Sequence, residues 1–124
     1  MAQRNLDVVR RGLAEVWDTR GRRFVTFEVL RRGGADADRW VQYLDGELNV
    51  RWPLDDEPAV ALAQRGVALP AGAFVSWHVA GVNAVIAVGD ARLDDVARLV
   101  VSLFETVVAR EDGFRLGARI DDHR

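Results

Sequence analysis

The chain has 124 residues and a mass of 13.8 kDa, with 49% hydrophobic and 29% charged residues and a formal net charge of −2. This size and composition predict one folded domain over residues 1–124. No apolar run approaches the ~18 residues of a membrane-spanning helix, which excludes a protein anchored by such helices. The absence of cysteine excludes disulfides, thiolate metal sites and a cysteine nucleophile.

The basic residues are all arginine, and they alternate with acidic residues along the chain. Proteins that bind nucleic acids usually carry a basic stripe, so we expect no nucleic-acid partner. Arginine, alanine, valine and glycine have GC-rich codons, so their abundance predicts a bacterial genome of high GC content. The first residues lack the apolar stretch of a signal peptide, which favours a cytoplasmic location.

The first half of the chain predicts one helix followed by three strands. Apolar residues recur at helical spacing from residue 3 to residue 18. Residues 23–31, 39–44 and 48–52 then alternate apolar and polar side chains, which is typical of strands. Glycines 33–34 and the pair Asp45-Gly46 supply the turns between them. These segments therefore predict an antiparallel meander.

The second half predicts a short helix, two strands and a long helix. Pro58 favours a helix start, and the expected helix covers residues 57–65. Residues 73–80 and 84–88 have strand patterns. The last helix, Ala91 to Arg110, is apolar over more than half of its circumference, so it needs cover on more than one side. Residues 111–124 form a tail that could add an edge strand or stay mobile.

The order of elements is α-β-β-β-α-β-β-α, which predicts an α+β fold. We expect a five-stranded antiparallel sheet with the helices packed on one face. The domain core should lie within residues 3–110, with residues 111–124 outside it as the C-terminal tail.

Residues that could carry chemistry are sparse. His78 lies in the middle of an expected strand and His123 lies near the C-terminus, so neither has the neighbouring ligands that a metal site needs. The acidic pairs fall on helix starts and in the tail, and no phosphate-binding loop or nucleophile motif is present. The sequence therefore predicts no metal, no cofactor and no enzyme activity.

Four tryptophans are many for a chain of this length, and their positions bear on where a partner could bind. Trp17, Trp52 and Trp77 fall on faces that we expect to point into the core. Trp40 instead shares a strand face with Leu44, beside two apolar residues of the neighbouring strand. If the helices cover the other face, these residues form an exposed apolar patch of the kind that marks partner surfaces. A register error of one residue would bury the patch. The candidate partner-binding residues are Phe24, Leu30, Trp40 and Leu44.

The order of elements resembles that of type III secretion chaperones and the related YbjN-like proteins, a group of small bacterial chaperone-fold domains of the TY-Chap type. Residues 39–43, Arg-Trp-Val-Gln-Tyr, are similar to the aromatic-Val-Gln-aromatic strand of this group. The apolar last helix followed by residues 113–116, Gly-Phe-Arg-Leu, is compatible with it. The resemblance implies a non-enzymatic, acidic, cytoplasmic homodimer that binds an extended segment of another protein.

Two other functions remain open at this point. One is a small-ligand-binding or regulatory domain with an apolar pocket between the sheet and the last helix, lined by Trp77, Val79 and Phe104. The other is an enzyme whose site would lie around His78 and Glu28.

Overall fold

The predicted helices and strands form in the computed structural model, which describes residues 2–109 and 111–123. The helices are α1 (Ala2–Val16), α2 (Pro58–Gln64) and α3 (Leu93–Leu103), and α3 continues into a π-helical turn, η1 (Phe104–Val108). The strands are β1 (Arg23–Arg31), β2 (Gly34–Leu44), β3 (Glu47–Arg51), β4 (Phe74–Val79), β5 (Asn83–Ala87) and β6 (Leu116–Asp122). The fold is α+β, as expected.

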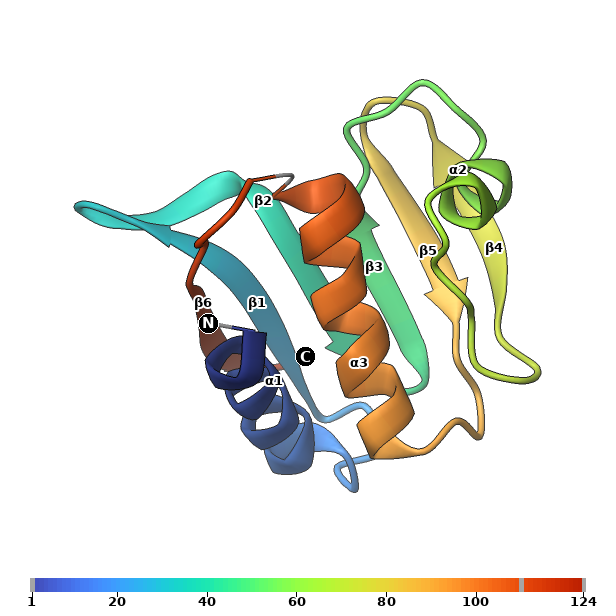
Figure 1. Cartoon of the computed structure of the whole chain (residues 1–124). Coiled ribbons are helices and arrows are strands. Elements are labelled where there is room, and N and C mark those ends of the chain that lie inside the picture. Colours follow the sequence, from blue (N-terminus) through green and yellow to red (C-terminus); the bar gives the residue numbers. More distant parts are fainter. Residues whose placement is uncertain (1, 110, 124) are drawn as a thin grey trace.

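The strands form one six-stranded antiparallel sheet in the order β4-β5-β3-β2-β1-β6. All three helices lie on the same face of this sheet (Figure 1). The turn between β2 and β3 has positive φ at Asp45 and at Gly46, the backbone conformation of a tight two-residue hairpin. The hairpin of β1 and β2 extends beyond the rest of the sheet (Figure 1).

The prediction of five strands was wrong, because part of the tail forms a sixth. β6 pairs with β1 from Arg23 opposite Asp122 to Val29 opposite Leu116. β1 would otherwise be an unprotected edge strand, and the alternating tail satisfies its backbone groups. The side chain of Phe114, just before β6, is buried against Phe104 with ring centroids 6.0 Å apart. The core therefore extends beyond residue 110.

The last helix is covered from two sides, as its apolar circumference requires. Its buried residues include Val96, Val100 and Leu103, which join the main core. We expected this helix to run regularly from Ala91 to Arg110. Regular α-helix instead ends at Leu103 and the π-helical turn follows, while Arg110 lies outside the described residues.

Helices α1 and α3 are also joined by charge. The Nε atom of Arg10 lies 2.6 Å from Oδ1 of Asp94, and Nε of Arg98 lies 3.1 Å from Oδ2. These two guanidinium groups hold the pKa of Asp94 below its ordinary value. Packing of the helix pair is thus reinforced at its solvent-facing side.

Gly12 lets α1 approach the sheet closely. A Cβ atom at this position would lie 2.6 Å from Cε1 of Phe27, which is fully buried. We predict that Gly12→Ala destabilises the fold by about 1–3 kcal/mol, because the core would be overpacked. Urea unfolding followed by circular dichroism measures this change.

The control is Ala14→Gly, at an exposed position of the same helix, which should cost about 1 kcal/mol through helix propensity alone. Propensity by itself would make Gly12→Ala stabilising. A more stable Gly12→Ala variant would therefore show that α1 does not pack as closely as described.

Candidate functional site

The described helices leave the opposite face of the sheet uncovered (Figure 1). On the helix side, alternate residues of the central strands are fully buried, such as Val25 and Val41. The residues between them point to the opposite face, which we call the open face. A sheet face carrying only polar side chains would be expected if it met only water.

All four residues nominated from the sequence lie on the open face, and we call them the Trp40 patch: Phe24, Leu30, Trp40 and Leu44. Trp40 pairs with Glu28 across β1 and β2. Leu30 is 42% exposed and its side chain lies over Gly117 of β6. The other three are half-buried, so none of the four belongs to the core.

Polar groups surround Trp40 on the open face. Gln42 donates a hydrogen bond from Nε2 to Oγ1 of Thr26, at 3.1 Å. Nη1 of Arg119 on β6 lies 3.3 Å from Oε1 of Glu28. Together with Trp40 these side chains line a shallow pocket. The Trp40 patch thus joins an apolar surface to groups that can hydrogen-bond to a bound polypeptide.

Phe24 is partly covered by the end of the chain. Its ring meets the ring of His123 edge to face, with centroids 6.3 Å apart. The backbone N–H of His123 donates to the carbonyl oxygen of Arg22 at 2.8 Å. His123 therefore packs on Phe24 and continues the pairing of the chain end with Arg22.

The prediction that Trp77 points into the core was wrong. Regular alternation places Val75, Trp77 and Val79 on one face, but β4 contains a bulge at Ser76. Val75 pairs with Ile86 whereas Trp77 pairs with the adjacent Val85, so the strand changes face between them. Trp77 and Val79 consequently lie on the open face, and Trp77 is 53% exposed.

The bulge creates a second apolar surface that sequence reasoning missed. It brings Trp77 and Val79 to the same face as Phe74, which is 58% exposed. We call these three residues the edge patch, because β4 is the outermost strand of the sheet. One signal in the sequence could have indicated it: residues 66–89 contain no aspartate, glutamate, lysine or arginine.

The Trp40 patch and the edge patch are separated by polar residues. Asn49 of β3 accepts a hydrogen bond from Nδ2 of Asn83 on β5, at 2.9 Å. Arg51, at the end of β3, donates from Nη1 to the carbonyl oxygens of Gly81 and Val82. The open face therefore offers two distinct apolar surfaces and not one continuous one.

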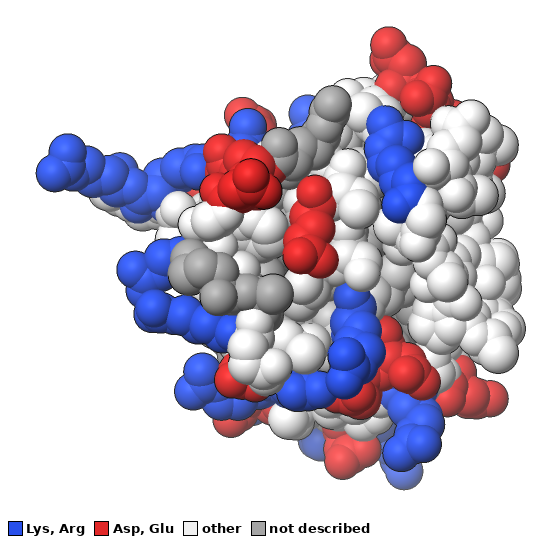
Figure 2. All heavy atoms as spheres, viewed as in Figure 1, with Lys and Arg blue, Asp and Glu red and all other residues white. Residues whose placement is uncertain are grey.

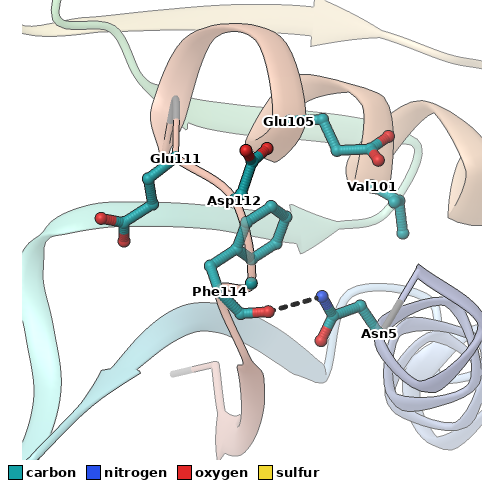
Figure 3. Close-up of a pocket in the computed structure, with 7 residues that line it drawn as sticks. Asn5, Val101, Glu105, Glu111, Asp112 and Phe114 are labelled. Atoms are coloured by element: carbon teal, nitrogen blue, oxygen red, sulfur yellow. Dashed lines mark hydrogen bonds between the residues drawn. The ribbon is translucent and has the colours of Figure 1, made fainter.

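A small pocket on the helix side has a structural role. Nδ2 of Asn5 donates to the Phe114 carbonyl oxygen at 2.9 Å, and Oδ1 accepts from the Leu116 N–H at 3.0 Å (Figure 3). Three carboxylates also line the pocket, but Glu111 points away from the other two (Figure 3). Its Oε1 lies 2.6 Å from Nη1 of Arg31. Asn5 thus fixes the segment that leads into β6.

The structure does not bring together the residues of the predicted ligand pocket, nor those of the alternative enzyme site. Phe104 is fully buried, whereas Trp77 and Val79 are exposed on the open face, so these three line no common pocket. Glu28 lies on β1 and His78 on β4, with three strands between them. Among the described residues, no group of three or more histidine or acidic side chains is placed to hold a metal ion.

Comparison with protein-family models, curated proteins and solved structures finds no match. The resemblance to secretion chaperones accordingly rests on the order of elements and the strand containing Trp40. Within residues 2–109 and 111–123, no helix is both long enough and apolar enough to cross a membrane.

We predict that Asn5→Ala destabilises the chain and exposes β6. It leaves a buried carbonyl and a buried N–H without their partner, which costs about 1–3 kcal/mol for each group. Unfolding by urea and amide hydrogen exchange of residues 116–122 measure both effects. The control Gln3→Ala removes an exposed amide of the same helix and should change stability by less than about 0.5 kcal/mol. Equal effects of the two variants would contradict this role of Asn5.

Proposed function

We propose that the chain is a non-enzymatic protein-binding module, which acts as a homodimeric chaperone or adaptor for a partner protein. The partner contributes an extended segment that lies on the open face at the Trp40 patch. The observation that carries the proposal is the position of this patch: its four apolar residues lie on a sheet face that no described element covers. The resemblance to cytoplasmic secretion chaperones is in accord with it.

The chemistry of the Trp40 patch suits a polypeptide. Tryptophan is enriched among the residues that dominate binding energy at protein interfaces, because it offers a large and rigid contact area. Gln42 and Glu28 line the pocket beside Trp40 and can hydrogen-bond to the backbone or side chains of an extended segment. A broad, shallow surface of this kind is less suited to a small molecule, which needs a deep pocket to bury most of its area.

The test uses an unbiased library of displayed peptides. Peptides are selected on the intact chain, and the affinity of an enriched peptide is measured by tryptophan fluorescence and calorimetry. We predict that Trp40→Asp weakens its binding by about 30-fold or more, the loss typical of a central interface residue.

Val60→Asp is the matched control, because it adds the same charge to an exposed apolar residue on α2, on the helix side of the sheet. This variant should bind the peptide like the unmodified chain. Failure to enrich any peptide, or equal binding by the Trp40→Asp variant, would overturn the proposal. Circular dichroism of both variants shows that neither change acts by unfolding the chain.

A further inference from the structure

The two edges of the sheet differ in how they are protected. Edge strands expose unpaired backbone groups, and proteins usually guard them with charged residues. β6 follows this rule, since Arg119 and Asp121 form an ion pair with 3.0 Å between Nε and Oδ2. β4 lies in the charge-free segment 66–89 and exposes Phe74, Trp77 and Val79. Only one edge is therefore guarded against pairing with another strand.

The surroundings of β4 on the helix side carry few charged side chains. In Figure 2, charged side chains crowd the hairpin of β1 and β2 and the lower rim of the molecule. The area in which α2 and β4 lie in Figure 1 is largely free of them. The exposed Val60 of α2 lies in this part of the chain. The unguarded edge therefore lies in a part of the surface that carries few charged side chains.

We propose that β4 pairs antiparallel with β4 of a second copy of this chain, so that the two sheets join into one. The twofold axis passes between Ser76 and Trp77. Phe74 then lies opposite Val79 of the second copy, and Val75 lies opposite His78. The edge patches of the two copies form one apolar cluster on the open face.

The bulge at Ser76 makes this register possible. Residues directly opposite each other in antiparallel strands must point to the same face. Phe74 and Val79 are five positions apart, so in a regular strand they would point to opposite faces. The bulge places both on the open face and leaves Val75 and His78 on the other. In this register Phe74 and Val79 pair on the open face and Val75 and His78 pair on the other, without a mismatch of faces, while the bulges of the two copies meet at the twofold axis.

Charge favours a second copy as the occupant. A twofold interface brings each patch against itself, so charged residues would meet residues of the same sign. The absence of charge from residues 66–89 removes this repulsion. A second strand also satisfies the backbone groups of β4, which a lipid surface cannot do. An anionic membrane would in addition require basic residues near the patch.

This inference locates the dimer contact of the proposed function, and it leaves the Trp40 patch free in both copies. The first experiment measures the mass of the chain by sedimentation equilibrium at micromolar concentration. We expect twice the 13.8 kDa of a single chain. Val79→Asp should reduce the mass to that of one chain. The control Leu30→Asp should remain dimeric, although Leu30 is as exposed as Val79, at 42%.

A crosslink tests the register, since the chain has no cysteine of its own. In the double variant Phe74→Cys with Val79→Cys, the introduced thiols of two copies lie directly opposite, with about 4.5–5.5 Å between Cα atoms. Mild oxidation should form a covalent dimer. The single variant Phe74→Cys should not, because its two thiols are offset by the length of four ladder steps, from Ala87 to Asn83 on β5, or about 14 Å along the strand.

Several results would overturn the β4 contact. These are a monomer at micromolar concentration, a dimer that persists in Val79→Asp, equal crosslinking by the single and double variants, or binding of the monomer to vesicles of anionic lipid through Trp77. Peptide binding by the Val79→Asp variant separates this question from the proposed function. If that variant binds the selected peptide and is still sensitive to Trp40→Asp, the Trp40 patch acts without the β4 contact.

Discussion

The apolar circumference of the last helix constrains the whole fold. Buried residues on several sides of α3, among them Val96, Leu99 and Leu103, need neighbours in more than one direction. The sheet supplies one neighbour and α1 supplies another, so the helices must share one layer (Figure 1). The described residues form no second helical layer, so the other face of the sheet stays open. The candidate binding surface is thus a consequence of how the core is built.

The pairing of β6 with β1 determines which edge of the sheet remains available to pair with another strand. Asn5 hydrogen-bonds to the backbone at Phe114 and Leu116, and β6 then completes the pairing of β1. The charged residues of β6 guard that side of the sheet, whereas β4 keeps an apolar edge. This difference between the two edges places the proposed partner contact and the proposed dimer contact on separate parts of the sheet. A partner segment would meet the Trp40 patch near β1 and β2, and a second copy would meet β4.

The strands and helices could largely be predicted because their signals are local. Alternation of apolar residues and the turn at Asp45-Gly46 determine the meander, and residues 23–31 form β1 as predicted. The same local register placed Trp40 and Leu44 correctly on the face opposite the core. The start of each helix was predicted to within a few residues, from periodicity for α1 and α3 and from Pro58 for α2.

The remaining features depend on contacts between distant parts of the chain. The alternation in residues 114–120 allowed a strand, but its formation depends on the free edge of β1, about ninety positions away in the sequence. The face of Trp77 depends on a single bulge residue, Ser76, which nothing in the local pattern identifies. Alternation alone therefore gave the wrong face for Trp77 and Val79, and the edge patch was missed.

Hydroxyl-radical footprinting of the chain, alone and with a saturating selected peptide, tests directly whether the partner segment lies on the open face. We predict that Trp40 and Leu44 are oxidised in the free chain and protected by the peptide, while Val60 on the helix side is oxidised equally in both. Trp52, which is fully buried, should resist oxidation throughout. Protection of Val60 with no change at Trp40 would contradict the claim that the open face receives the partner.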